Sequence, residues 1–197
     1  MRKLILASSS PRRKKILTDL GLQFEVIPPE ISEEVKPNES PKDFAIRCST
    51  DKAKEVAKKH NGIIISADTI VVLENKIIGK PKDKDDAVQI LKSLSGKKHQ
   101  VITGITLFDS ESQKLISDFV QTDVWITKLN DDDIEKYINT FEPSDKAGAY
   151  AAQGKGAVLV ERVDGDFFNV VGLPVFKLYK LLKEFNIDLL KYPGNAQ

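Results

Sequence analysis

The sequence has few of the residues on which disulfides and metal cages depend. Cys48 is its one cysteine, so no internal disulfide can form, and its two histidines are too few for a histidine-cysteine zinc site. Tryptophan and methionine each occur once. A single thiol fits a reducing compartment, so we expect a protein of the cytoplasm.

Long apolar runs and an excess of one charge are also missing. No run approaches the ~18 apolar residues that a membrane-spanning helix needs, and the apolar run at residues 1–7 is too short for a signal peptide. Thirty basic and 29 acidic side chains give a formal net charge of +1. Because a protein with this balance has no global field that recruits nucleic acid or acidic lipid, we expect neither partner.

The residues that are present favour an ordinary globular protein. Hydrophobic residues make up 41% of the chain and charged residues 30%, which excludes a wholly disordered or collagen-like chain. A length of 197 residues predicts one domain over residues 1–197, or two small lobes that share a core.

The chain opens with a pattern typical of a strand, a turn and a helix. Residues 4–7 are apolar, and helical spacing follows from Pro11 to Gly21. Ser10 suits the N-cap position before Pro11 in the first turn, and Gly21 suits the position after the last turn. A second helix is predicted at residues 41–60, with Ser40 and Asp43 at capping-box spacing.

Strands and helices alternate irregularly along the rest of the chain. We predict strands at residues 62–73, 76–79, 99–108, 114–127 and 157–163, and helices at residues 83–94, 131–141 and 174–185. Adjacent hairpins argue against a purely parallel sheet. The predicted fold class is therefore α/β, with a mixed, twisted sheet flanked by helices.

A candidate anion site lies where the first strand meets the first helix. Ser8, Ser10 and the unpaired amides of the helix start stand beside Arg12 and Arg13. Helix N-termini bind phosphate, and arginine grips two phosphate oxygens at once. The alternative is a capped surface helix with solvated arginines, and this segment alone does not separate the two interpretations.

Asp68 is the sharper signal because it lies in an apolar run at residues 63–72. A carboxylate buried there should neutralise, pair with a base or bind a cation. Strand alternation makes the side chains of Asp68 and Thr69 point apart unless the strand ends or bends, and we expect a bend or strand end near Ala67. The alternative is a structural aspartate that caps a turn or pairs with a buried lysine.

Lys52 is a candidate partner for Asp68, since it shares a helical stripe with Cys48 and Val56. The competing interpretation, slightly favoured by the sequence, is a lysine that extends from the edge of an apolar face to water. Lys80 stands in a Gly-Lys-Pro turn that could project it toward a ligand.

Two further segments combine charge with small residues that permit close approach of a ligand: residues 145–150, with Lys146, and residues 153–156, with Gln153. A tight connecting loop is the competing interpretation. The acidic run 131–133 suits the first turn of a helix and is interpreted as a solvated cap, not a metal cluster. Cys48 is interpreted as a buried apolar residue and not a nucleophile.

Five ordered motifs together resemble the Maf family of nucleoside triphosphate pyrophosphatases, historically called septum formation inhibitor proteins. The motifs are LILASSSPRR (4–13), SADT (66–69), GKPKD (79–83), SDKAGAYAAQGKG (144–156) and VVGLP (170–174). The resemblance implies a mixed α/β fold like that of inosine triphosphatases, with two lobes around a cleft. It also implies hydrolysis of a nucleoside triphosphate to the monophosphate and pyrophosphate with a divalent cation, Mg²⁺ or Mn²⁺.

The resemblance also assigns roles to residues. Asp68 matches the proton acceptor, and Asp68 and Glu33 match acidic positions suited to the metal. The combination of Arg12, Thr69 and Gln153 is similar to that of the branch acting on dTTP and UTP. The remaining positions associated with binding the triphosphate are Ser8, Arg13, Lys52, Lys80 and Lys146. A homodimer is implied in the same way.

The predicted function is therefore a dTTP/UTP pyrophosphatase that also clears modified pyrimidine triphosphates, a house-cleaning role in nucleotide metabolism. Two other functions stay open from the sequence. One is a nucleotide-sensing binding protein that acts in cell division without significant hydrolysis, and the other is an inosine triphosphate pyrophosphatase with a purine-sized pocket.

Overall fold

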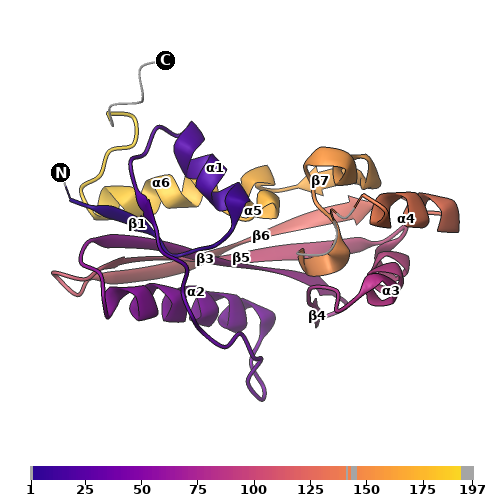
Figure 1. Ribbon diagram of the computed structural model, residues 1–197, viewed down its shortest axis with the longest axis horizontal. Coiled ribbons are helices and arrows are strands. Elements are labelled where there is room, and N and C mark those ends of the chain that lie inside the picture. Colours follow the sequence, from indigo (N-terminus) through magenta and orange to yellow (C-terminus); the bar gives the residue numbers. More distant parts are fainter. Residues whose placement is uncertain (1, 141, 143–145, 192–197) are drawn as a thin grey trace. The chain divides into compact units, whose positions relative to one another are not determined.

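The computed structural model describes residues 2–140, 142 and 146–191 (Figure 1). Its strands are β1 (Leu4–Leu6), β2 (Glu25–Val26), β3 (Ile63–Leu73), β4 (Lys76–Ile78), β5 (Lys98–Asp109), β6 (Leu115–Ile126) and β7 (Val160–Asp164). Its α-helices are α1 (Pro11–Asp19), α2 (Pro41–Ala57), α3 (Lys84–Leu94), α4 (Asp131–Ile138), α5 (Phe167–Val171) and α6 (Val175–Glu184). The 3₁₀ helices η2 (Ala147–Ala149) and η3 (Gly154–Leu159) lie between α4 and β7 in the chain.

The strands form a mixed sheet. They hydrogen-bond in the order β2-β1-β3-β5-β6-β7, and β4 pairs with β3 off this path. β1 is parallel to both β2 and β3, whereas β4 is antiparallel to β3 and β7 to β6. The predicted mixed α/β sheet with flanking helices is confirmed.

The chain divides into two compact units. Unit 1 comprises Met1–Asp68, Thr103–Val120 and Gly172–Gln197, and unit 2 comprises Thr69–Ile102 and Gln121–Val171. The boundary therefore separates Asp68 from Thr69 within β3. Each unit is described below by itself.

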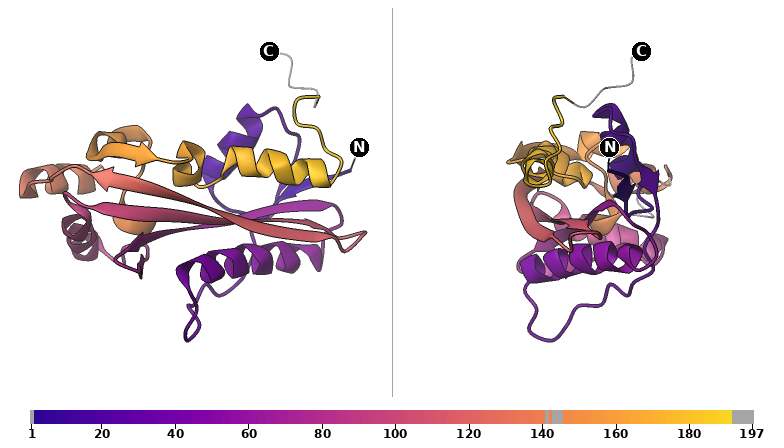
Figure 2. Two further views of the ribbon diagram at one scale, coloured as in Figure 1. Left: turned by 180° about the vertical axis from the view of Figure 1, so that it is seen from behind. Right: turned by 90° about the vertical axis from the view of Figure 1, so that its left-hand side faces the viewer.

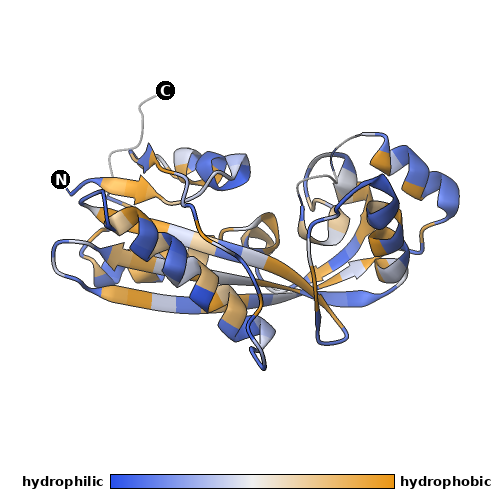
Figure 3. Ribbon diagram, turned by 60° about the horizontal axis from the view of Figure 1, so that its bottom comes forward, coloured by the Kyte–Doolittle hydropathy of each residue, from blue (hydrophilic) through white to orange (hydrophobic). Residues whose placement is uncertain are grey.

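In unit 1, α2 covers one face of the strands, and α1 and α6 lie on the other face (Figures 1 and 2). Apolar residues line the strands, while α2 alternates between polar and apolar positions because only one of its faces is buried (Figure 3). Its buried residues are Phe44, Ala45, Cys48, Ser49, Lys52, Ala53 and Val56. Two of these are polar, and both belong to the site described below.

Unit 2 packs α3, α4 and η2 around its own apolar core. Leu91 and Leu94 of α3 are fully buried with Val124 of β6, and Ile134 of α4 joins the same cluster. α4 begins with a capping box between Asn130 and Asp133. Its first turn holds the acidic run 131–133, so the predicted helix cap is confirmed.

Several sequence predictions need correction. The strand containing Asp68 does not end at Ala67, because β3 runs from Ile63 to Leu73. The strand predicted at residues 157–163 begins only at Val160, after η3. Phe141, the predicted end of the fourth helix, lies outside the described residues; within them the helix stops at Ile138.

Two short elements, β2 and α5, have no counterpart in the sequence predictions. Ser40 caps α2 as expected, by accepting a bond from the amide of Asp43. The Asp43 carboxylate accepts a bond from the Ser40 hydroxyl, 2.6 Å away. Across residues 2–140, 142 and 146–191, no helix combines the length and apolar character needed to cross a membrane.

Candidate active site

The turn between β1 and α1 has the geometry of an anion site. Ser8 is buried, and its Oγ accepts a bond from the amide of Ser10 at 3.1 Å. Ser10 is the N-cap of α1, and its side chain accepts a bond from the amide of Arg13. The first turn of α1 contains no acidic residue, so only basic side chains accompany the positive end of the helix dipole.

Arg13 turns back from α1 onto this turn. Its Nε donates to the Gly172 carbonyl at 2.7 Å, and its Nη1 donates to Ser8 Oγ at 3.2 Å. Burial lowers the pKa of the Arg13 guanidinium, and the Asp68 and Glu33 carboxylates oppose that shift while Arg12 adds to it. The Arg13 guanidinium is therefore held in place by hydrogen bonds and interacts electrostatically with both carboxylates of the site. The alternative of two solvated surface arginines is wrong for Arg13.

Asp68, Lys52 and Glu33 form a compact charged cluster. Lys52 Nζ lies 2.6 Å from Asp68 Oδ1 and 2.6 Å from Glu33 Oε1. The Lys52 and Asp68 side chains are each 9% exposed, while Glu33 is 44% exposed. Lys52 thus points inward, and the interpretation that it extends to water is wrong. Asp68 pairs with a buried lysine, as its structural alternative predicted, and the second carboxylate on the same ammonium goes beyond that alternative. Two carboxylates share one ammonium, so the three groups retain one negative charge when all are ionised.

The backbone of α2 lies so close to β5 that the position of the helix, and with it that of Lys52, is fixed. A Cβ added to Gly104 would lie 2.2 Å from the Ala45 carbonyl oxygen of α2. Beside this contact, Ser66 Oγ donates to the Ser49 carbonyl at 2.6 Å, and Ser49 Oγ lies 2.8 Å from Thr106 Oγ1. These contacts join α2 to the strand that contains Asp68.

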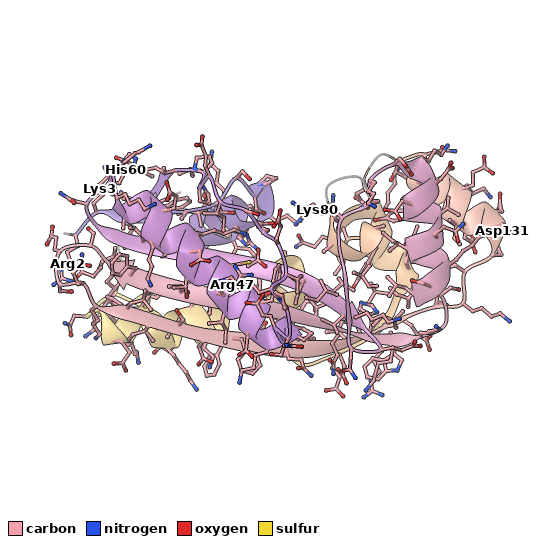
Figure 4. All side chains as sticks on the ribbon, turned by 90° about the horizontal axis from the view of Figure 1, so that it is seen from below. Arg2, Lys3, Arg47, His60, Lys80 and Asp131 are labelled. Carbon is pink, nitrogen blue, oxygen red and sulfur yellow. The ribbon has the colours of Figure 1, made fainter. Side chains whose placement is uncertain are left out.

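In unit 2, Lys80 and Lys146 lie on loops that are joined through their backbones. The amide of Gly148 donates to the Gly79 carbonyl at 3.1 Å. Gly148 has a φ of 73°, and a Cβ there would meet Val71 Cγ2 of β3 at 2.9 Å. Lys146 donates to the Glu142 carbonyl. Lys80 is exposed and projects from the loop after β4 (Figure 4).

Gln153 is exposed at the start of η3, in a segment that is held at both ends. Glu142 accepts bonds from the amides of Lys155 and Gly156 at 3.2 and 2.8 Å. On the other side, His99 Nε2 lies 2.7 Å from the Tyr150 hydroxyl. The Gln153 side chain is therefore presented by a fixed backbone.

The predicted site residues fall into two groups. Unit 1 holds Ser8, Arg12, Arg13, Glu33, Lys52 and Asp68, and unit 2 holds Thr69, Lys80, Lys146 and Gln153. Hydrogen bonds, ion pairs and electrostatic interactions connect the members of the first group, and a backbone hydrogen bond joins the loops of Lys80 and Lys146. Ser144 and Asp145 of the fourth motif lie outside the described residues.

Sequence reasoning missed the residues that position the site. No local sequence pattern marks Gly104, Glu142 or His99, because each acts through a contact with a residue distant in sequence. Arg47 was also missed, although its i,i+4 spacing to Asp51 predicts an ion pair. Cys48 is fully buried, and burial raises the pKa of its thiol to about 12, so its interpretation as a core residue is confirmed.

Across residues 2–140, 142 and 146–191, no group of three or more His, Cys, Asp or Glu side chains is arranged to hold a metal ion. Asp68 and Glu33 nevertheless supply two carboxylates that converge on one cation, Lys52 Nζ. Mg²⁺ commonly binds through one or two carboxylates together with substrate phosphates. Asp68 and Glu33 match that requirement in number, while Lys52 Nζ occupies the position on which they converge.

Comparison with known proteins identifies close relatives. The chain is 52% identical over 191 residues to the dTTP/UTP pyrophosphatase of Thermoanaerobacter sp. (strain X514), covering 95% of this chain and 100% of that protein. It is 49% identical to proteins of the same name from Methanosarcina mazei, over 96% of this chain and 97% of that one, and from Clostridioides difficile, over 94% and 97%.

Solved structures share the fold at low identity. A HAM1 protein from Coxiella burnetii superposes with a TM-score of 0.52 at 16% identity, over 93% of this chain and all of that one. The Ham1 protein of Staphylococcus aureus gives 0.51 at 13% identity, over 93% and 99%. The family model described as Maf-like protein matches residues 3–185. The chain therefore belongs to the Maf-like protein family.

Proposed function

We propose that this chain hydrolyses dTTP and UTP to the nucleoside monophosphate and pyrophosphate. The observation that carries the proposal is the buried Asp68–Lys52 pair with Glu33 beside it, electrostatically coupled to Arg13 at the start of α1. A carboxylate next to fixed cations suits attack on a polyanionic substrate. The names of relatives at about 50% identity support the same reaction.

In this proposal Asp68 orients and deprotonates the attacking water. Lys52 bonds Oδ1, and we assign the water to the second carboxylate oxygen, Oδ2. Lys52 fixes the orientation of Asp68 by donating a hydrogen bond to Oδ1 at 2.6 Å. General-base catalysis of this kind contributes typically ~10²–10⁴-fold.

The phosphates bind at the turn before α1. The Ser8 hydroxyl and the Arg12 amide would donate hydrogen bonds, because Pro11 has no N–H and the Arg13 amide already bonds Ser10. The guanidinium groups of Arg12 and Arg13 neutralise negative charge. Pyrophosphate leaves with additional negative charge, which fixed cations stabilise most strongly as it develops. We assign Lys80 and Lys146 of unit 2 to the triphosphate as well.

Glu33 would hold the divalent cation, Mg²⁺ or Mn²⁺, and Asp68 would be its second ligand as an alternative to its role as base. When bound, such an ion acts as a Lewis acid on a phosphoryl oxygen. Glu33 lies on an irregular segment and is half-exposed, so it can meet a ligand from solvent while Asp68 stays buried.

Base selectivity is assigned to Arg12, Thr69 and Gln153. The Gln153 amide has both a donor and an acceptor, which match the N3–H and an adjacent carbonyl of thymine or uracil. Modified pyrimidine triphosphates with the same edge belong to the proposed substrate range. Location in the cytoplasm, a homodimeric state, the absence of a nucleic-acid partner and a single functional domain over residues 1–197 stay predictions.

A panel of nucleoside triphosphates with Mg²⁺ tests the proposal. We expect pyrophosphate release, fastest with dTTP and UTP. Release of orthophosphate alone would overturn the assignment of the cleaved bond, and a preference for ITP would favour the purine enzyme. Calorimetry with dTTP in parallel identifies the sensor, which would bind the nucleotide tightly without product.

A further inference from the structure

Glu33 depends on something other than secondary structure for its position. It lies in residues 27–40, a segment without helix or strand, and its side chain is 44% exposed. Even so, its carboxylate reaches the buried Lys52 ammonium at 2.6 Å. An irregular, exposed segment places a side chain reproducibly only if other contacts fix its backbone.

Arg47 of α2 supplies those contacts (Figure 4). Its Nη2 donates to the carbonyl of Glu34, the residue next to Glu33, at 2.8 Å. The same guanidinium grips the Glu39 carboxylate with two bonds, Nε to Oε1 at 2.5 Å and Nη2 to Oε2 at 2.8 Å. Nη1 donates to Asp51 of α2 at 3.3 Å. One side chain thus binds the segment at two points and its own helix at a third.

The pair of Arg47 and Glu39 is well formed. The two side chains are 19% and 9% exposed, so water competes weakly for their bonds. The hydrogen bond from Arg47 lowers the pKa of Glu39 to about 2, and the bond from the Lys36 amide acts in the same direction. Glu39 also closes a turn, because its amide donates to the Lys36 carbonyl at 3.1 Å. The two bonds from the Arg47 guanidinium to the Glu39 carboxylate therefore fix a folded turn of the backbone, not only the Glu39 side chain.

The segment is fixed at its other end too. Ile27 donates its amide to the Leu6 carbonyl at 3.0 Å, directly after β2. Between Ile27 and the turn at Lys36, the Glu34 carbonyl is bonded to Arg47, and Glu33 is bonded to Lys52. Arg47 and Lys52 are five residues apart on the same helix. One rigid helix therefore fixes both the backbone next to Glu33, through Arg47, and the Glu33 carboxylate, through Lys52.

We propose that Arg47 is a positioning residue that clamps residues 27–40 onto α2 and so holds the Glu33 carboxylate at the Lys52–Asp68 pair. The inference rests on the proposed function, in which Glu33 serves the reaction. It assigns no contact between Arg47 and substrate. Losing the two Arg47 bonds to Glu39 lets residues 27–40 move, and the Glu33 carboxylate moves with them. Misplacement of a reacting group by about 1 Å costs up to ~10²-fold in rate.

Arg47→Lys tests the proposal, because lysine keeps the charge and loses the planar fork. Hydrogen exchange should show the amides of Lys36 and Glu39, which donate to Glu39 Oε2 and to the Lys36 carbonyl, losing protection by about tenfold or more. Asp51→Ala is the matched control, since it removes the bond of Arg47 to its own helix and leaves both bonds to the segment. Its protection should match that of the wild type. Unchanged protection in Arg47→Lys would overturn the clamp, whether or not the protein hydrolyses dTTP.

A double-mutant cycle with Glu33→Gln tests the route of action. Arg47→Lys should lower kcat for dTTP by about tenfold and leave KM within about twofold, and should cost less than about twofold further in the Glu33→Gln background. Equal losses in both backgrounds would show that Arg47 acts independently of Glu33. If Arg47→Lys fails to fold, Glu39→Gln weakens the same clamp from the segment side and replaces it in both experiments. A wild type without pyrophosphate release would overturn the proposed function and leave the exchange result standing.

Discussion

The two units hold their candidate site residues in different ways. In unit 1, Asp68 and Lys52 are buried and bonded to each other, with Glu33 on the same ammonium. In unit 2, Lys80 and Gln153 are exposed. The loop of Lys80 is held by a backbone bond from Gly148 to Gly79, and the segment of Gln153 by backbone amides that donate to the Glu142 side chain. Side-chain ion pairs fix the first group, and backbone geometry fixes the second.

This difference suits a division of labour. A general base must stay within hydrogen-bond reach of its water, and buried ion pairs limit its motion. Recognition of a base edge needs a donor and an acceptor at the surface, on a backbone that does not move. Perturbing unit 1 should therefore affect stability and turnover together, while perturbing unit 2 should affect selectivity or pH dependence.

Lys52→Met should have the largest effect on stability. Removing one partner of a buried pair leaves an uncompensated carboxylate and costs about 3–5 kcal/mol. Lys15→Met is the control, because the Lys15–Asp19 pair is 76% and 59% exposed and should contribute less than ~1 kcal/mol. Urea unfolding measures both. Equal losses would contradict the distinction between buried and exposed pairs, and Lys52→Met with Asp68→Asn should recover part of the loss.

His99 in unit 2 should make stability depend on pH. Burial lowers its pKa from 6.5 to about 4, and nearby Asp123 only partly opposes the shift. The unfolded chain then binds more protons between these values, so stability contributed by neutral His99 is full above pH 6.5 and is lost as pH falls toward 4. The loss is about 3 kcal/mol.

His99→Gln removes that titration. Denaturant midpoints of the variant should vary less with pH than those of the wild type between pH 6.5 and 4. A wild-type slope that survives the substitution would assign the pH dependence to other groups.

Gly104→Ala should lift α2 from β5. The new methyl would overlap the Ala45 carbonyl, and overpacking of this kind costs typically about 1–3 kcal/mol. Gly79→Ala is the control, since nothing lies within 4 Å of a Cβ there. Thermal unfolding compares the two. If Gly104→Ala is as stable as Gly79→Ala, close contact between α2 and Gly104 is not needed for stability.

Glu142→Gln should have the smallest effect. Its side chain accepts two amide bonds in the Gln153 segment, and a glutamine replaces one acceptor oxygen with a donor. A lost hydrogen bond of about 0.5–1.5 kcal/mol corresponds to roughly two- to tenfold. We expect the preference for dTTP over ITP to fall by that factor while kcat for dTTP changes little. A larger loss of kcat than of selectivity would contradict the division of labour.

The sequence predicts the charged residues of the site better than the residues that hold them in position. Asp68 stands out because a carboxylate interrupts an apolar run, and Lys52 because it shares a stripe with buried residues. Glu33 has no such pattern: residues 27–40 lack periodicity, so it was identified by resemblance alone. Gly104 shows its role only when a helix from another part of the chain passes over it.

The fold divides in the same way. Long strands such as β3 and helices such as α2 follow from periodicity and capping residues, and their predicted positions are confirmed within a few residues. β2 has two residues, too few for any period, and it pairs only because β1 lies beside it. η3 begins at a glycine with a φ of 68°, and the chain turns there before β7 can start.

The most direct measurement compares pyrophosphate release from dTTP by the wild type and by Asp68→Asn at equal, confirmed folding. The isosteric amide keeps the volume and removes the base, so we expect kcat to fall by about 10²–10⁴-fold while the circular dichroism spectrum stays the same. Turnover within about twofold of the wild type would contradict the central claim that the buried carboxylate of β3 performs the reaction.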